Sequence, residues 1–170
     1  MPDRSAHASA YSRLRFSLAA MHTPGHAPGH LVFCERHTGL AYAGDMVAGT
    51  GTILIDPEDD GDMSAYLASL EKIAAAGPLA LIPAHGPVIE DPQGCLRRYR
   101  THRMMREERI LAAIPSAWRA VSAVLAEAYA DTPVALWPLA ARSLEAHLRK
   151  LATEGRIHRN GDDVSAAARR

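Results

Sequence analysis

Short apolar stretches separated by Gly and Pro turns fill the first half of the chain, and this pattern predicts β-strands. The stretches 30–36 and 40–45 flank a tight turn and predict a hairpin. The segment 79–86 predicts a buried strand that runs into a loop, as its run of apolar residues indicates. Two weaker strands are predicted over 13–20, which alternates loosely, and over 52–56, which is short and β-branched.

One amphipathic helix interrupts these strands. Its apolar residues recur at helical spacing and are Met63, Tyr66, Leu67, Leu70, Ile73 and Ala74. Asp62 is placed to cap the start of this helix, and Gly77 followed by Pro78 ends it. The order β, β, β, α, β predicts an α/β sandwich layer.

The pattern becomes almost wholly helical after Pro92, so we expect one domain over 1–92 and a second over 93–170. Helices are predicted over the stretches 95–114, 117–130 and 135–155. The segment 156–164 predicts a short hairpin with an Asn-Gly turn at residues 160 and 161. Three helices and a terminal hairpin indicate an all-α winged-helix-like domain, and we expect 165–170 to form a frayed tail.

Composition indicates the cellular location of the protein and the kinds of partner it has. The formal net charge is zero, so no global charge directs the chain to nucleic acid or to a membrane surface. Cys34 and Cys95 lie far apart in no metal-like pattern, which indicates free thiols in a reducing compartment. No apolar run is long enough to cross a bilayer, and the first residues lack the pattern of a signal peptide. The expectation is a cytoplasmic protein with no membrane partner.

Candidate metal chemistry begins in the stretch MHTPGHAPGH, residues 21–30. Its three histidines, His22, His26 and His30, are four apart, but the Gly and Pro residues between them exclude a helix. A rigid turn of this kind can hold an imidazole in place as a metal ligand. A hydrogen-bonded surface histidine is the alternative for each of them.

Two further polar residues follow predicted strands directly. Asp45 follows the strand 40–44, and His85 follows the strand that begins near residue 79. Active sites of α/β folds gather where strands end at one edge of the sheet, and the combination of His26, Asp45 and His85 suits Zn²⁺. Alternatively, Asp45 caps a turn and His85 is hydrogen-bonded to the backbone.

The motifs TPGHAPGH, AGD and PAHGPVI, in this order, resemble the second half of the metallo-β-lactamase fold. The resemblance covers about residues 14–158, and the helical tail is similar to the β-lactamase-like protein 2 subgroup. It implies that His26 binds a first metal, that Asp45 bridges two metals and that His85 binds the second. Two zinc ions are therefore expected, with His30 as a supporting residue that orients a ligand.

The same family carries an H-x-H-x-D-H motif in its first half, and no two histidines in this chain lie two apart. The resemblance therefore implies the C-terminal half of an αββα sandwich without the remaining metal ligands, and weak metal binding. We interpret the chain as a truncated product. Its apolar strands would lack a cover, which predicts an exposed face that self-associates.

The leading functional hypothesis is a metal-dependent hydrolase that attacks a carbonyl or phosphorus with a metal-bound hydroxide. The resemblance implies a small-molecule ester, lactam or thioester substrate, or single-stranded RNA. The alternatives are an inactive fragment and a nucleic-acid-binding winged helix, because the helix from residue 96 to 110 is rich in arginine. Its charged residues are Arg97, Arg98, Arg100, Arg103, Arg106 and Arg109 against Glu107 and Glu108. These arginines could equally solubilise an exposed helix face.

Overall fold

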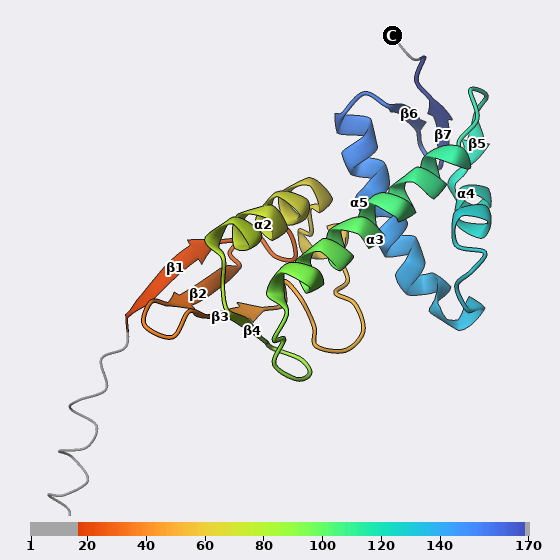
Figure 1. Cartoon of the computed structure of the whole chain (residues 1–170). Helices are drawn as coiled ribbons and strands as arrows, with labels where there is room; N and C mark the ends of the chain where they lie inside the picture. The colour runs from red at the N-terminus through yellow and green to blue at the C-terminus, as the bar shows by residue number, and fades with distance from the viewer. Residues whose placement is uncertain (1–16, 169–170) are drawn as a thin grey trace, which may run out of the picture.

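The computed structural model describes residues 17–168, which fold into a sheet-containing unit and a winged-helix unit joined by one long helix (Figure 1). The first unit holds a four-stranded sheet in the order β1-β2-β3-β4. Its strands are β1 (Leu18–His22), β2 (Leu31–Glu35), β3 (Leu40–Gly44) and β4 (Ala80–Pro83). The predicted hairpin is confirmed, because β2 pairs antiparallel with β3. The first residues of the strand predicted over 13–20 lie outside the described residues.

The prediction of a strand over 52–56 is wrong. This segment is an extended stretch without strand pairing, followed by the short 3₁₀-helix η1 (Pro57–Asp59). Ile53 and Ile55 are buried as their β-branched character suggested. Two backbone carbonyls of this stretch, however, accept hydrogen bonds from side chains. The Ile53 carbonyl accepts from Arg103, and the Leu54 carbonyl accepts from His26. These side-chain donors take the place of a neighbouring strand.

The helix α2 (Met63–Ala76) covers one face of the sheet, as the sequence pattern predicts. The Asp62 carboxylate accepts a hydrogen bond from the Ala65 N–H at 2.9 Å, which confirms the predicted N-cap. Gly77 closes the helix in the left-handed conformation at φ 64°. The helix buries Met63, Tyr66, Leu70 and Ile73 against inward-facing strand residues such as Val32 and Leu81.

The helix α3 (Pro92–Ala112) belongs to both units. It begins three residues earlier than predicted, because the Asp91 side chain caps it by accepting from the Gly94 N–H at 2.8 Å. Its first turns place Cys95 and Leu96 in the core of the sheet unit, whereas Ile110 lies in the second core. The predicted domain boundary at residue 92 thus coincides with the start of a helix that both cores share.

The winged-helix unit contains β5 (Arg119–Ala120), α4 (Val121–Ala128), η2 (Val134–Leu136), α5 (Trp137–Thr153), β6 (Ile157–Asn160) and β7 (Asp163–Ala166). The expected winged helix is present, although a three-stranded sheet in the order β5-β7-β6 means that the unit is not purely helical. The helix predicted over 117–130 is shorter, because Arg119 and Ala120 pair with β7 instead.

Two details of the predicted hairpin differ in the structure. Asn160 pairs with Asp163, so the central turn residues are Gly161 and Asp162 rather than Asn160 and Gly161. Gly161 takes φ 57°, as the first central position of a tight hairpin turn requires. The tail expected from residue 165 does not begin there, since Ser165 is buried and belongs to β7, and residues 169 and 170 lie outside the described residues.

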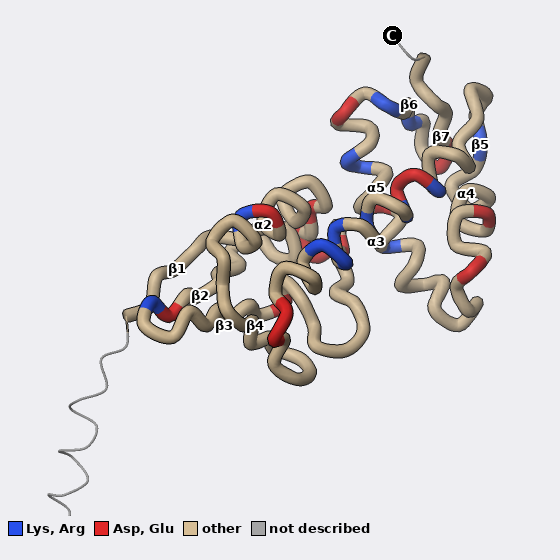
Figure 2. The backbone as a smooth tube through the Cα atoms, in the orientation of Figure 1, with Lys and Arg blue, Asp and Glu red and all other residues tan. Residues whose placement is uncertain are grey.

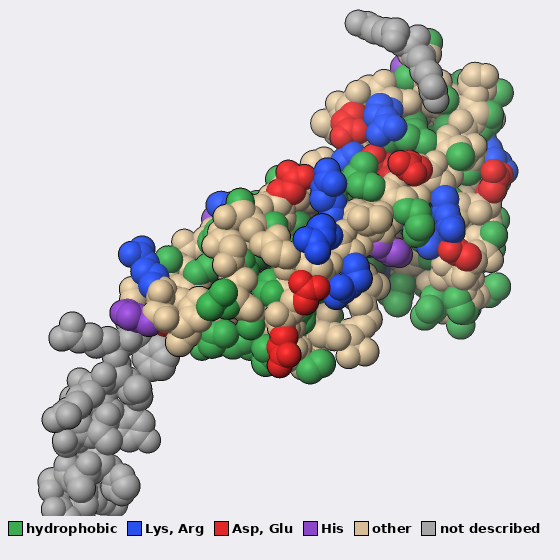
Figure 3. Space-filling model, viewed as in Figure 1, with side chains coloured by type: hydrophobic (Ala, Val, Ile, Leu, Met, Phe, Trp, Pro, Cys, Tyr) green, Lys and Arg blue, Asp and Glu red, His purple; other side chains and the backbone are tan. Residues whose placement is uncertain are grey.

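The face of the sheet that lies away from α2 is exposed and apolar among the described residues. Its exposed large side chains are Leu18, Leu31, Phe33 and Tyr42. Phe33 lies directly opposite Tyr42 in the strand register. Figure 3 shows hydrophobic side chains gathered on the surface near β3 and β4. Within residues 17–168, no helix combines the length and apolar character that a bilayer crossing needs.

Candidate metal centre

The three predicted ligands follow strands that end at one edge of the sheet. β1 is antiparallel to β2, β2 is antiparallel to β3, and β3 is parallel to β4. The strands β1, β3 and β4 therefore run in the same direction. His26 lies in the loop after β1, Asp45 directly follows β3 and His85 follows β4. This is the edge at which α/β sheets place ligand sites.

The structure brings Asp45 and His85 together. The His85 Nε2 lies 3.4 Å from the Asp45 Oδ1, and both side chains are solvent-accessible. The backbones of the two turns are joined as well, because the Ala84 N–H donates to the Gly44 carbonyl at 2.9 Å and the Gly49 N–H donates to the His85 carbonyl at 2.8 Å. Residues 40 apart in sequence thus lie side by side, on two turns that backbone hydrogen bonds join.

Glycine is required where these turns meet. A Cβ on Gly49 would lie 2.5 Å from the Pro87 carbonyl oxygen, which is closer than non-bonded atoms approach. Gly86 has φ 88° and packs against Gly49 and Thr50. The small residues around Asp45 and His85 therefore permit the backbone contacts that hold the pair in place.

The loop that carries His26 is clamped by α2. The Asp62 N–H donates to the Gly25 carbonyl at 2.8 Å, and the Ser69 hydroxyl donates to the Pro24 carbonyl at 2.7 Å. The His26 Nδ1 lies 3.1 Å from the Leu54 carbonyl oxygen, which can only accept, so Nδ1 carries the proton. The lone pair of His26 is therefore on Nε2, as in metal-binding histidines oriented by a carbonyl.

His30 supports the aspartate turn. Its Nε2 accepts a hydrogen bond from the Asp45 N–H at 3.1 Å, so its Nδ1 carries the proton and donates to the Thr23 hydroxyl at 2.9 Å. Burial, together with the nearby His26, lowers the pKa of His30, although Asp45 opposes this shift. Both ring nitrogens are thus occupied within the protein. This geometry fits the supporting role predicted for His30.

His22 closes the loop, and its Nε2 is bonded to a backbone carbonyl rather than directed at the candidate ligands. Its Nε2 donates to the Pro28 carbonyl at 2.7 Å, and its own carbonyl accepts from the Lys72 ammonium at 2.9 Å. Three histidines at equal spacing therefore have three environments. In the part of the chain that the structure describes, His26 is the one of the three whose Nε2 makes no hydrogen bond while its Nδ1 is anchored.

The described residues supply part of a metal ligand set. No group of three or more His, Cys, Asp or Glu side chains within residues 17–168 is arranged to hold a metal ion. Asp45 and His85 form a pair, and His26 does not join them in such a group. The nitrogen and oxygen donors have the right chemistry for zinc, but a catalytic zinc site needs three protein ligands. The fit is therefore incomplete.

Two tyrosines to which the sequence analysis gave no role at the site, Tyr66 and Tyr99, also support this edge. The buried Tyr66 hydroxyl donates to the Met46 carbonyl at 2.8 Å, directly after Asp45. The Tyr99 hydroxyl accepts from the Ala48 N–H at 2.9 Å. Burial is the main reason that the pKa of each phenol is raised, so both remain protonated. Nothing in the sequence separates such a tyrosine from an ordinary core residue.

Two curated animal proteins are similar in sequence to this chain. The chain is 35% identical over 155 residues to the Beta-lactamase-like protein 2 homolog of Drosophila melanogaster, covering 89% of the chain and 51% of the relative. It is 30% identical over 140 residues to the homolog of Caenorhabditis elegans, covering 82% and 46%. The chain thus spans about half the length of the curated relatives it matches.

A solved structure agrees with the fold. A metallo-beta-lactamase family protein of Thermus thermophilus superimposes with a TM-score of 0.74 at 23% identity, covering 88% of this chain and 49% of that one. Residues 8–85 match the family model of the Metallo-beta-lactamase superfamily, and residues 120–167 match the Beta-lactamase associated winged helix domain. The chain therefore belongs to the metallo-β-lactamase superfamily, with a domain of that superfamily followed by its associated winged helix.

Proposed function

We propose that this chain contributes His26, Asp45 and His85 to the metal centre of a hydrolase. The observation that carries the proposal is the 3.4 Å approach of the His85 Nε2 to the Asp45 Oδ1 at the ends of neighbouring parallel strands. The free Nε2 of His26 at the same sheet edge supports it. These donors suit Zn²⁺ or a similar divalent cation.

A bound divalent cation would polarise a carbonyl or phosphoryl group and acidify a bound water molecule. The residues of this chain orient the ligands for that role. The Leu54 carbonyl fixes the tautomer of His26, and His30 holds the turn of Asp45. The ligand set that the described residues supply is incomplete.

Zinc binding tests the ligand assignment. We expect purified protein to bind zinc weakly, and Asp45→Ala to abolish the zinc that remains after dialysis. Asp59→Ala is the matched control, because Asp59 is an exposed carboxylate of η1. Zinc per chain is measured by mass spectrometry and affinity by calorimetry. Unchanged zinc in Asp45→Ala would show that the assignment is wrong.

The substrate class proposed first is a thioester or a related small ester or lactam. The Atrochrysone carboxyl ACP thioesterase of Aspergillus chevalieri is 34% identical over 98 residues, covering 58% of this chain and 30% of that protein. Single-stranded RNA is the alternative substrate. Zinc-dependent turnover of a model thioester, lost in Asp45→Ala, would support the first class, and zinc-dependent cleavage of RNA alone would support the second.

The nucleic-acid-binding alternative receives little support from α3. Arg100 pairs with Glu71 at 2.9 Å, and Arg106 pairs with Asp131 at 2.9 Å. Figure 2 shows acidic residues interspersed with the basic ones along and around this helix. Most of these arginines therefore serve intramolecular contacts. Salt-sensitive RNA binding that survives removal of metal would favour this module over the hydrolase.

A cytoplasmic location remains part of the proposal. Cys34 and Cys95 are both free thiols, and Cys95 is buried in the core. Burial raises the pKa of the Cys95 thiol, so it remains protonated at neutral pH. Paired cysteines would be expected of a small protein exported to an oxidising compartment. Fractionation of the source cells, with detection of the endogenous protein, tests the location.

A further inference from the structure

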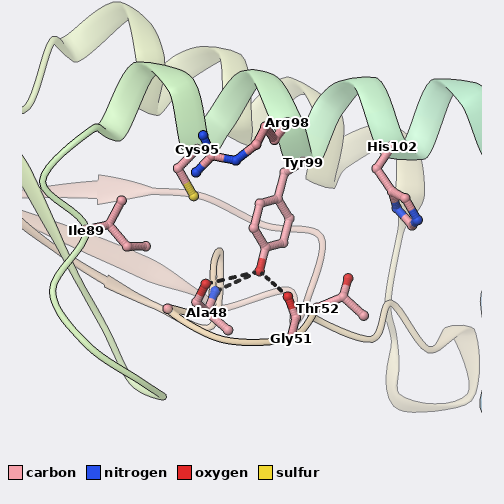
Figure 4. Close-up of a pocket in the computed structure, with 9 residues that line it drawn as sticks. Ala48, Gly51, Thr52, Ile89, Cys95, Arg98, Tyr99 and His102 are labelled. Atoms are coloured by element: carbon pink, nitrogen blue, oxygen red, sulfur yellow. Dashed lines mark hydrogen bonds between the residues drawn. The ribbon is translucent and has the colours of Figure 1, made fainter.

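A pocket of about 390 Å³ opens between the N-terminal half of α3 and the loop that follows β3 (Figure 4). Arg98, Tyr99 and His102 line it from the helix, and Thr52 lines it from the loop. In Figure 4 Tyr99, at the centre, and His102 extend toward the loop, whereas the Arg98 side chain lies along the helix toward Cys95. A volume of this size accommodates a small ligand or one group of a larger ligand.

The pocket is attached to the candidate metal turn. Gly49 lines it and donates its N–H to the His85 carbonyl at 2.8 Å. The Tyr99 hydroxyl fixes the same loop through the Ala48 N–H at 2.9 Å. A ligand group held here would therefore keep a constant position relative to Asp45 and His85.

The lining offers hydrogen-bond donors and no carboxylate. Arg98 and His102 are one helical turn apart on α3. The Arg98 guanidinium lies 3.8 Å from the Asp91 carboxylate, and both side chains are about 70% exposed, so this ion pair is weak. The Thr52 hydroxyl oxygen lies 3.4 Å from the Arg103 Nη2, which donates to it and leaves the hydroxyl proton available.

Positive charge surrounds this lining. Burial, followed by the guanidinium groups of Arg103 and Arg106, lowers the pKa of His102, although Asp131, which pairs with Arg106, opposes this shift; the imidazole is therefore neutral and can donate one N–H. Arg103 is itself buried beneath Thr52, where its charge is poorly screened by water. The pocket therefore combines donors with a positive local potential, which favours an anion.

We propose that this pocket binds the phosphate group of a small phosphate ester, with Arg98, His102 and Thr52 as its donors. The planar fork of an arginine matches the oxygens of a phosphate, and an imidazole and a hydroxyl can serve the remaining oxygen. That the ester is the substrate rests on the hydrolase function proposed above. The binding of the phosphate does not depend on it.

The charges beyond the pocket favour one isolated phosphate rather than a polyanion. Further along α3, Arg100 is paired with Glu71, while Arg106 and Arg109 both bind Asp131. A nucleic-acid strand would require a continuous series of available cations to follow its backbone. Among the described residues of this helix, the available guanidinium that lines the pocket is Arg98.

The test is a titration of the full chain with glycerol 3-phosphate and, separately, with inorganic phosphate, in which ¹H–¹⁵N NMR spectra monitor binding. The protein is first freed of metal on a chelating resin. We expect saturable shifts at Gly51 and Thr52, with the ester bound at least as tightly as the free ion. Arg98→Ala should raise the dissociation constant about tenfold or more, as expected for loss of a charged hydrogen bond.

Arg97→Ala is the matched control, because Arg97 is the exposed neighbour on α3 and does not line the pocket. It should leave the dissociation constant nearly unchanged. Thr52→Val should weaken binding about threefold or more, whereas Thr50→Val, outside the lining, should not. Absence of saturation, or equal losses in the Arg97 and Arg98 variants, would overturn the proposal.

Tight binding of a single-stranded RNA oligonucleotide that depends equally on both arginines would also overturn it. Because the titration uses metal-free protein, a failure of zinc binding or of hydrolysis leaves its result intact. The phosphate site and the proposed hydrolase function are therefore tested separately.

Discussion

His22, His26 and His30 show how one sequence pattern yields three roles, because the partner of each ring nitrogen decides what the histidine can do. The His22 Nε2 is bonded to a carbonyl, and the His30 nitrogens bond the Thr23 hydroxyl and the Asp45 N–H. His26 is anchored through Nδ1 alone. The motif indicated a rigid loop, but the tautomers depend on carbonyls and hydroxyls that the sequence cannot place.

Gly44→Ala tests the support of Asp45. The new Cβ would lie 2.5 Å from the His30 Nε2, and Gly44 has φ 53°. We expect a loss of about 2 kcal/mol in the free energy of unfolding, because both backbone strain and steric conflict arise. Chemical denaturation measures it.

Gly29→Ala is the control for this change. No atom lies within 4 Å of a Cβ built on Gly29, and its φ is not positive. Its stability should stay within about 0.5 kcal/mol of the parent protein. Equal losses in the two variants would contradict the role assigned to the contact between Gly44 and His30.

At the scale of elements, α3 unites the two cores through buried charge as well as through apolar contacts. Glu107 is almost fully buried, and its carboxylate accepts from the Lys150 ammonium at 2.9 Å and from the Arg156 guanidinium at 3.0 Å. His147 lies 3.3 Å from it and is fully buried. The sequence suggested a solvated helix face, whereas the structure shows that this part of α3 is an interior surface.

Glu107→Gln should lower the free energy of unfolding by about 3 kcal/mol, because it leaves two cations and a buried histidine without their carboxylate. Glu108→Gln, an exposed neighbour on the same helix, should change it by less than about 0.5 kcal/mol. Urea denaturation of both variants at neutral pH provides the measurement. Comparable stability of the two proteins would contradict this account of the network.

Acid should weaken the same network. Burial alone would raise the pKa of Glu107, but the hydrogen bonds from His147 and Lys150 hold it below the ordinary value of 4.5. A lowered pKa in the folded state contributes stability above pH 4.5 that is lost as the pH falls through the folded value. Denaturation midpoints between about pH 6 and about pH 3 should therefore fall more steeply for the parent protein than for Glu107→Gln.

At the scale of the whole molecule, one face of the sheet is covered and the other is open. The helices α2 and α3 bury the inward side, while Leu31, Phe33 and Tyr42 remain about 40% exposed on the other side. An apolar surface of this kind favours association with another protein surface. A second copy of this chain is the partner that the sequence analysis predicts.

Sedimentation velocity over a range of protein concentrations checks this prediction. We expect the parent protein to associate, and Phe33→Ser to shift the association to at least about tenfold higher concentration, because it removes apolar area from the centre of the face. Val134→Ser is the control, since Val134 is 72% exposed but lies on the winged-helix unit. Unchanged association in Phe33→Ser would exclude the sheet face as the contact surface.

Local sequence patterns determined the hairpin, the capped helix α2 and the winged-helix order, because caps, turns and apolar periodicity act over a few residues. They also determined that His26, Asp45 and His85 each follow a strand. Only the tertiary structure decided that Asp45 meets His85, that the stretch 52–56 is unpaired and that the Glu107 network is buried. Those outcomes depend on contacts between residues distant in sequence, and no local pattern specifies which carbonyl or charge will lie opposite.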